Sequence, residues 1–501
     1  MGTATVDRPA DAGSPPASAR RRVPIWLVLL ATSLPMFMAT LDNLVMTSAL
    51  PVISTDLHPS IGQLQWFMNA YTLAFATLML PAATLGDRLG RRRMFLGGIA
   101  VFTLASIASA LSTSPETLIA ARAVQGAGAA AILPLSLTLL AGAVPVAKRP
   151  LAIGIWGGVT GLGVALGPVV GGAVVEGISW QSIFWINVPV GMLAVPLVLW
   201  VLDESFGRRS RLDVLGVLLG GAGIFAGVWA IVHGNDDGWT SASVLGTLAV
   251  SAAALGAFVV RERRVSYAAM PTRLFRSRSF AMANVIALAF SIGMFGAVFL
   301  LSQYLQIVLG YSPLEAGIRT LPWTAAPMVV APIAGMLAPR VGVRPLLTIG
   351  LILQAAALGY LALVITPGAG YTEQIPGLIL AGVGMGLTFA PSATAVLSDM
   401  AEADHATASS VNATVREIGV SLGVAVLTAV FLAADGHLTP TGYADALRPA
   451  LLVGMVSVAL GIIPALLLPG KKAAAESSYA QVTAAPAEAT AAEVPVAAAQ
   501  V

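Results

Sequence analysis

The chain has 501 residues, of which 57% are hydrophobic and 10% are charged, and its mean hydropathy is +0.85. A soluble domain carries about 25% charged residues, so this composition excludes an ordinary soluble protein and places most of the chain in lipid. The formal net charge is only +3, and the absence of cysteine excludes a disulfide framework, a thiolate metal site and a thiol nucleophile.

Apolar runs long enough to cross a hydrocarbon core of about 30 Å follow one another along the chain. They lack the alternation of barrel strands, so they predict an all-α integral membrane protein. The tails 1–22 and 471–501 are low in complexity and are predicted to be disordered. The predicted transmembrane helices are 24–53, 61–85, 94–112, 115–144, 150–175, 182–202, 212–232, 242–260, 280–308, 314–338, 345–365, 374–398, 407–433 and 446–468.

Basic residues are concentrated in every second loop. Of the 27 Lys and Arg, 23 lie in the N-terminus, in alternate loops and in the C-terminus. Lys and Arg collect in cytoplasmic loops, so the pattern predicts a multi-pass protein of the cell membrane with both termini in the cytoplasm. The positive charge is therefore a topology signal and does not indicate nucleic-acid binding, although the basic cluster 261–264 could contact anionic membrane lipid.

A weak internal repeat suggests how these helices are grouped. The segment 83–94 is echoed by the segment 335–346, and each follows a helix that ends in small residues. The echo predicts a six-helix unit used twice, with two extra helices between the units. The expected parts are an N-terminal bundle, the extra pair, a cytoplasmic linker and a C-terminal bundle, at 23–202, 203–260, 261–279 and 280–470.

Two opposite charges fall deep inside predicted helices. A charge at the bilayer centre costs about 2.5–3.5 kcal/mol, so such a residue usually faces a cavity or a partner. Asp42 lies about 16 Å from the outer end of its helix and is interpreted as a carboxylate that binds a proton or a cationic substrate. The alternative is a structural Asp bonded to a neighbouring helix. Arg122 lies at a similar depth and needs a carboxylate, carbonyl or water, unless it snorkels to the interface.

Glu417 is a second candidate proton carrier, about ten residues inside its predicted helix. The alternatives are a lipid-interface residue and an interhelical salt bridge. Because adjacent residues on a helix do not face each other, Arg416 and Glu417 are expected to contact different neighbours.

Two glycine-containing segments need a specific explanation. Gly163, Gly167 and Gly171 recur every fourth residue beside Pro168, which predicts a close helix contact that moves. The second segment, 86–93, places Asp87 and Gly90 among several Arg side chains of the predicted loop. Anchoring by positive charge explains the arginines, whereas the acid could cap a helix N-terminus or bind Arg in a breakable gate.

Motifs for chemistry are absent from the sequence. It contains no P-loop lysine motif, no nucleophile elbow and no dinucleotide-binding glycine pattern, so no enzyme activity and no cofactor are predicted. The four His lie in predicted loops without the spacing of metal ligands, so no metal site is predicted either.

Several of these segments together resemble the major facilitator superfamily and, within it, the fourteen-helix drug:proton antiporters. The segment 41–51 is similar to that branch's helix 1 motif, although Leu44 and Thr47 depart from it. The segments 83–93, 122–130 and 163–172 are similar to the loop 2–3 motif, the helix 4 motif and the antiporter motif of helix 5. The gate and antiporter-motif residues that correspond are Asp87, Arg88, Gly90, Arg91, Gly163, Gly167, Pro168, Gly171 and Gly172.

The resemblance implies two bundles that alternate around a central cavity which Asp42 faces, driven by the proton gradient without any other cofactor. Asp42, Arg122 and Glu417 are the expected proton-coupling residues. The implied function is export of small lipophilic drugs or antibiotics, neutral or monocationic, by a monomer. The alternatives are a dedicated exporter of an endogenous secondary metabolite and a non-transporting membrane sensor. The side chains expected to line the cavity are Asn43, Gln125, Asn187, Gln303, Gln306, Trp323 and Asn412.

Overall fold

The computed structural model describes residues 23–207, 211–265, 267–268, 270–366, 369–401 and 404–469. The predicted disordered tails lie outside these residues. The described chain is helical and has no strand, and 14 of its helical segments are long and apolar enough to cross a membrane, which confirms the predicted number. The helices are α1 (Ile25–Leu57), α2 (Ile61–Leu89), α3 (Arg91–Ala110), α4 (Pro115–Ala143), η1 (Val146–Lys148), α5 (Arg149–Gly177), α6 (Ser182–Trp185), α7 (Asn187–Val201), α8 (Val214–Asp237), α9 (Ala242–Arg264), η2 (Thr272–Arg276), α10 (Arg278–Ile307), α11 (Pro313–Thr324), α12 (Ala326–Val341), α13 (Val343–Val364), α14 (Tyr371–Leu397), α15 (His405–Ala433), α16 (Pro440–Leu460) and α17 (Ile462–Leu467).

Three of the membrane spans consist of two helices each. The breaks separate α6 from α7, α11 from α12 and α16 from α17. In each case a proline, Pro189, Pro327 or Pro464, follows the break within a few residues. A proline lacks the N–H that would bond four residues back, and its ring clashes with that carbonyl, so the first helix ends there.

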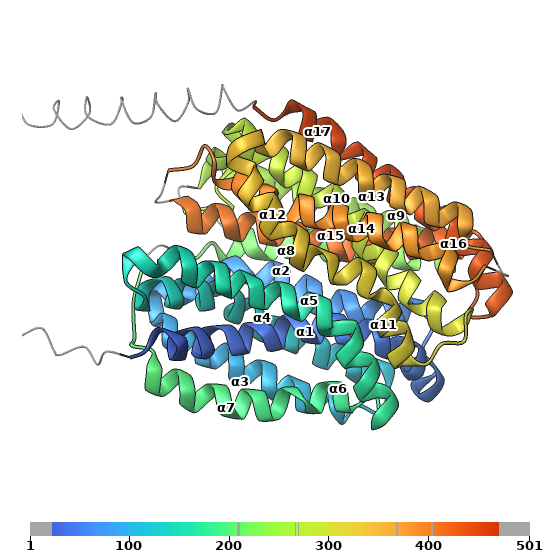
Figure 1. Cartoon of the computed structure of the whole chain (residues 1–501), viewed down its shortest axis with the longest axis horizontal. Coiled ribbons are helices and arrows are strands. Elements are labelled where there is room, and N and C mark those ends of the chain that lie inside the picture. The colour runs from blue at the N-terminus through green and yellow to red at the C-terminus, as the bar shows by residue number, and fades with distance from the viewer. Residues whose placement is uncertain are drawn as a thin grey trace, which may run out of the picture.

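The helices form two bundles with an extra pair beside them. Figure 1 shows α1 to α7 (blue to green) in one layer and α10 to α17 (yellow to red) in the other. Helix α8 contacts both α2 and α15, so the extra pair packs where the two bundles meet. Helix α9 packs on α8 and has only 11% of its most apolar window buried. This low burial leaves α9 facing lipid.

The predicted loop at 86–93 is almost entirely helical. Helix α2 continues to Leu89 and α3 begins at Arg91, so Gly90 alone joins them, with φ +114°. Gly342 makes the same one-residue connection between α12 and α13, with φ +90°. Both positions need a conformation that side chains other than glycine disfavour. The sequence echo between the two segments therefore reflects a shared helix–glycine–helix corner.

The two bundles are joined mainly away from the basic end, which we define as the end of the molecule where α3, α5 and α10 begin. Toward the opposite, far end, four hydrogen bonds connect α1 and α5 to α10 and α11. These bonds are Ser302 Oγ to Thr47 O (3.2 Å), Gln306 Nε2 to Ser48 O (3.1 Å), Thr324 Oγ1 to Ala165 O (3.3 Å) and Leu314 N to Glu176 Oε2 (3.1 Å).

Toward the basic end, α5 and α12 are exposed on most sides. Leu151 and Met336 are each 69% exposed, and no atom lies within 4 Å of a Cβ placed at Gly154, Gly157 or Gly158. The structure therefore joins α1 and α5 to the second bundle toward the far end and leaves much of α5 and α12 exposed at the basic end.

Candidate functional site

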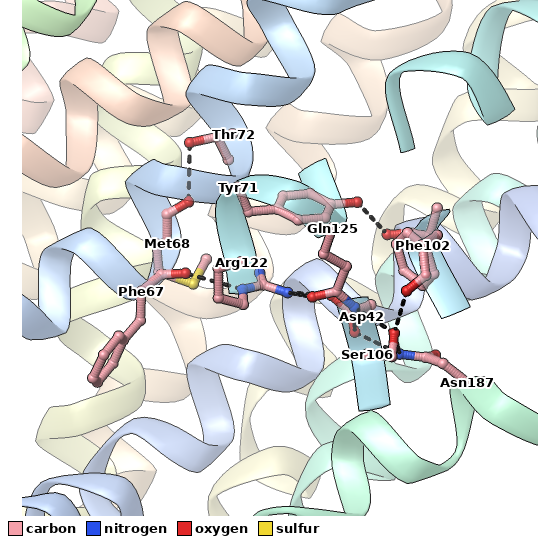
Figure 2. Close-up of polar contacts among 11 residues, drawn as sticks. Asp42, Phe67, Met68, Tyr71, Thr72, Phe102, Ser106, Arg122, Gln125 and Asn187 are labelled. Carbon is pink, nitrogen blue, oxygen red and sulfur yellow. Dashed lines mark hydrogen bonds and ion pairs between the residues drawn. The ribbon is translucent and has the colours of Figure 1, made fainter. Parts of the chain in front are cut away.

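Asp42 lies near the middle of α1 in a closed polar network inside the first bundle. Its side chain is 1% exposed. Oδ2 accepts a charged hydrogen bond from Arg122 Nη1, and Oδ1 accepts from Gln125 Nε2 (2.8 Å) and Asn187 Nδ2 (2.7 Å). Ser106 Oγ accepts from the same two amides, at 2.9 and 3.2 Å. Figure 2 shows these side chains converging on the carboxylate.

Arg122 on α4 is fully buried and is held on several sides. Its Nε donates to Phe67 O (3.1 Å), and Nη1 also donates to Gln125 Oε1 (2.7 Å). The guanidinium carbon lies 4.4 Å from the centre of the Tyr71 ring, and the Tyr71 hydroxyl donates to Ala39 O (3.1 Å) (Figure 2). Arg122 therefore does not snorkel to the interface. Its Nη2 has no hydrogen-bond partner among the described residues, so the two N–H groups of Nη2 remain available.

The network corrects one expectation about Asp42. Asp42 was expected to face a central cavity, but here Arg122, Gln125 and Asn187 enclose its carboxylate. A buried ion pair of this kind is stable only when both partners are present, because removal of one leaves an uncompensated charge that costs about 3–5 kcal/mol. Protonation of the Asp42 carboxylate would therefore leave the buried Arg122 without its counter-charge and disturb the hydrogen bonds around it.

Glu417 lies on α15, on the face that meets the first bundle. Ser421, one turn further on the same face, donates to Asn69 Oδ1 of α2 at 2.9 Å. The Glu417 side chain is 12% exposed, and its Oε1 lies 3.9 Å from Arg416 Nε. Arg416 also has a neighbour on another helix, because its guanidinium carbon lies 5.7 Å from the centre of the Phe389 ring of α14.

The glycine stripe of α5 packs within its own bundle. A Cβ at Gly163, Gly167 or Gly171 would lie 3.4 Å from Thr40, 2.5 Å from Leu44 and 2.9 Å from Val45, all on α1. The residue that follows this stripe, Gly172, contacts the other bundle instead.

Gly172 is that cross-bundle position. Its Cβ would lie 2.2 Å from Pro313 O of α11, and a Cβ at Gly317 would lie 2.3 Å from Pro168 O. Because backbone meets backbone here, the closest contact between bundles at the far end is at Gly172 and Pro168, and not along the stripe itself.

Asp87 and Arg91 form an ion pair at the α2–α3 corner. Asp87 Oδ1 accepts from Arg91 Nε at 2.7 Å, and the Asp87 carbonyl accepts from the backbone of Gly207 at 3.0 Å. Arg88 is exposed. Asp87 therefore binds Arg91. Binding an arginine was one of the two roles predicted for Asp87, and capping a helix N-terminus was the other.

The helix cap at this corner is Glu204, which is not among the residues predicted from the sequence. Glu204 Oε1 accepts from Arg92 N (2.9 Å) and Oε2 from Arg93 N (3.2 Å) at the start of α3. A Cβ at Gly90 would lie 2.7 Å from the carboxyl carbon of Glu204, a side-chain end that could move, so the positive φ is the reason this corner needs glycine. The only signal in the sequence is an acid among basic loops on the same side.

We expect Glu204→Gln to lower the free energy of unfolding by about 1 kcal/mol, because the amide cannot accept from both backbone N–H groups and carries no charge to offset the helix dipole. Thermal unfolding of the purified protein would measure the change. Asp203→Asn is the matched control, because Asp203 is an exposed neighbour that loses the same charge. Equal melting of both variants would contradict the capping role.

The side chains predicted to line a substrate cavity have several different partners. Gln125 and Asn187 bind Asp42, as described above. Gln306 reaches across to α1, whereas Gln303 Nε2 donates to Phe299 O of its own helix at 3.1 Å. Asn412 Nδ2 contacts Asn284 Oδ1 at 3.3 Å. Asn43 Oδ1 and Trp323 Nε1 are buried without a hydrogen-bond partner in the described chain.

Two cavities formed by described residues lie away from both Asp42 and Glu417. One, of about 620 Å³, lies at the basic end between α9 and η2. The other, of about 200 Å³, lies between α8 and α15 and is lined by Trp239, Val426 and Ala433 among others. Within the same residues, no group of three or more His, Cys, Asp or Glu is placed to hold a metal ion.

The fold and the site define a class: a polytopic membrane protein built as two helical bundles, with an ion pair buried inside one of them. A family model described as Major Facilitator Superfamily matches residues 32–424. The chain belongs to the major facilitator superfamily.

Several named proteins align with this chain over most of their own length. The tetracenomycin C resistance and export protein of Streptomyces glaucescens is 34% identical and aligns over 94% of this chain and 89% of its own. The methylenomycin A resistance protein of Streptomyces coelicolor is 36% identical over 83% of this chain and 87% of its own. The multidrug efflux pump LfrA of Mycolicibacterium smegmatis is 32% identical over 83% of both chains.

A solved structure shares the fold. It is a bacterial homologue of the human lysosomal transporter Spinster, described as inward-facing and unoccupied, with a TM-score of 0.63 and 18% identity. The match covers 93% of this chain and 99% of the other.

Proposed function

We propose that the protein is a proton-coupled antiporter that exports lipophilic drugs or antibiotics across the cell membrane by alternating access. The similar proteins named for antibiotic export and multidrug efflux support the export of small molecules. The observation that carries the proton coupling is the Asp42–Arg122 pair, which is buried and aligned with amide donors in one bundle.

The pair provides a route from protonation to movement. Protonated Asp42 would lose most of its attraction for Arg122, whose guanidinium keeps its charge and must then find another acceptor. The contacts of Asp42 link α1, α4 and α7, so losing them would let α1 shift against its neighbours. Helix α1 also carries the carbonyls of Thr47 and Ser48 that bind α10 across the bundles. Protonation at Asp42 thus reaches the closed far end through one helix.

The basic end is assigned to the cytoplasm, with both chain termini there, because Lys and Arg collect on that side of a membrane. With this orientation, the far-end contacts close the outside and the exposed halves of α5 and α12 open inward. Protons then enter from outside in the opposite state. Glu417 is a second proton carrier in this proposal, because it lies on the α15 face toward α2 and is largely buried.

Uphill transport in proteoliposomes would test the proposal. A pH gradient imposed across vesicles that hold the purified protein should drive uptake or release of a lipophilic dye, and dissipating the gradient should stop it. Proton movement on addition of substrate to de-energised vesicles is the second readout. A non-transporting membrane sensor would give neither signal.

The second candidate is a dedicated exporter of one endogenous secondary metabolite. It is favoured by the relatives named for tetracenomycin C and for methylenomycin A. A substrate screen in a host that lacks its own efflux pumps separates the two: a broad resistance profile supports a multidrug exporter, whereas resistance to a single compound class supports the dedicated one.

We expect monocationic and neutral lipophilic compounds to be exported much better than rigid dications. The only acid in α11 and α12 is Glu315, whose side chain is 53% exposed at the far end. Asp42 is already bound to Arg122, which leaves Glu417 as a candidate counter-charge for one positive charge. A second positive charge finds no further buried acid in α11 or α12, so its desolvation is not offset. Parallel efflux assays with an ethidium-like monocation and a bis-amidine would measure the ratio. Equal resistance to both, retained in Glu417→Gln, would contradict this charge limit.

A further inference from the structure

The larger cavity lies at the basic end, between the end of α9 and the 3₁₀ helix η2 that leads into α10. Its volume of about 620 Å³ is in the range of sites that bind small molecules. Its wall combines four apolar residues with two arginines, Glu262 and Thr272. The wall residues used here are Phe258, Val259, Met270, Phe275, Arg263 and Arg276.

The two arginines of the cavity differ from their neighbours. Arg263 and Arg276 are exposed and make no ion pair or side-chain hydrogen bond within the described part of the chain. By contrast, Arg261 Nη2 binds Asp213 Oδ1 at 2.6 Å, and Arg273 binds both oxygens of Asp404 at 2.6 Å. Among the described residues, the cavity therefore carries two positive charges that have no ion-pair partner.

The cavity also contains a buried acid, Glu262, which is hydrogen-bonded to the linker. Glu262 is 4% exposed, and its Oε2 accepts from the backbone N–H of Met270 at 2.9 Å. That bond fixes the chain that follows α9 against the helix. Glu262 thus shapes the wall, and the exposed rim remains positive.

The cavity opens where the membrane surface is expected. Helix α9 presents apolar side chains to lipid, with Val250 59% exposed and Val260 49% exposed, and its last turn carries the basic cluster. Such a transition from apolar to basic residues lies at the level of the lipid headgroups. An anionic lipid that binds at this level has both a charged headgroup for the arginines and an apolar acyl chain for the apolar wall.

We propose that this cavity binds one anionic phospholipid of the cytoplasmic leaflet. Its phosphate lies between Arg263 and Arg276, because guanidinium groups offer paired donors that match phosphate oxygens. One acyl chain follows Phe258, Val259 and Phe275. The bound lipid bridges the extra helix pair to the linker that begins the second bundle.

The linker connects the lipid site to α15 of the second bundle, so lipid binding at η2 can affect α15. Arg273 of η2 holds Asp404 at the start of α15 through two hydrogen bonds. These bonds from Arg273 keep the pKa of Asp404 below its usual value, so the pair is charged at neutral pH and is lost only in acid. The site lies apart from the Asp42 network, so lipid binding there is independent of the transport proposal.

Thermal unfolding of the full-length protein in detergent, titrated with phosphatidylglycerol, tests the site. We expect phosphatidylglycerol to raise the melting temperature, and Arg263→Ala with Arg276→Ala to weaken its apparent affinity by roughly 30-fold, since each juxtamembrane Arg contributes to attraction for anionic lipid. The charge-retaining double replacement by Lys should recover part of the affinity. Native mass spectrometry of the same samples counts the bound lipid.

The matched control is Arg264→Ala with Arg278→Ala, which removes two exposed arginines next to the cavity that do not line it. An equal loss of affinity in this control would show a general charge effect and overturn the site. Phosphatidylcholine should give no comparable shift, and a response to it would overturn the requirement for an anionic headgroup. Inorganic phosphate that competes with the lipid at low concentration would assign the arginines to a soluble anion instead.

Discussion

Asp42→Asn is expected to abolish proton-driven efflux. The substitution keeps the size of the side chain and its contacts with Gln125 and Asn187, but removes the group that binds and releases the proton. Proteoliposomes with an imposed pH gradient would measure the loss. Efflux at the wild-type rate under these conditions would exclude Asp42 from coupling.

Loss of folding must be separated from loss of coupling in this experiment. Asp42→Asn leaves Arg122 buried without its carboxylate, which is expected to cost about 3–5 kcal/mol of stability. The double variant Asp42→Asn with Arg122→Gln has no buried charge at this site, so its stability should recover while uphill transport remains absent. A double variant that folds and still couples protons would refute the role of the pair.

Arg122→Lys alone should retain partial function, because the charge survives without the planar fork.

Gly172→Leu is expected to prevent closure of the far end. The new side chain must displace the backbone of Pro313 and Leu314, because a Cβ alone would approach them to 2.2 and 2.6 Å. Overpacking of this kind costs about 1–3 kcal/mol, which shifts the equilibrium between the two states by roughly 5- to 150-fold toward the outward-open state. Transport should fall accordingly while the protein still inserts.

A single cysteine reports that shift, because the chain has no cysteine of its own. Ser302→Cys replaces a residue that is 6% exposed at the contact between the bundles. Its reaction with a membrane-impermeant maleimide should be faster in Gly172→Leu. Gly177→Leu is the matched control on the same helix end, because a Cβ there has no atom within 4 Å. If both variants label at the wild-type rate, Gly172 does not gate the far end.

Gly167→Leu separates the two faces of α5. Its Cβ would meet Leu44 of α1 at 2.5 Å, within the same bundle. The glycine stripe is therefore expected to affect packing of α1 and, through it, the Asp42 network, whereas Gly172 acts directly between the bundles. The two residues are five positions apart on one helix, and the rotation of the helix assigns them to different partners.

The sequence by itself determined the helical membrane fold. Each of the 14 spans must satisfy its own backbone hydrogen bonds in lipid, so apolar length alone identifies it. The same physics singled out Asp42, Arg122 and Glu417, because a charge inside such a run is costly wherever the run packs. Helix ends were less accurate, since hydropathy does not register the polar turns that extend α2 and α9 beyond the apolar core.

Only the tertiary structure decided which partners these residues have. Gln125 and Asn187 are polar residues in separate helices, and their meeting at Asp42 depends on how α1, α4 and α7 pack. Glu204 caps α3 from 112 positions along the chain. Such contacts leave no local periodicity in the sequence, because a hydrogen bond between distant elements constrains their geometry and not the pattern around either residue. The sequence therefore determines which groups need a partner, and the packing of the bundles determines the partner.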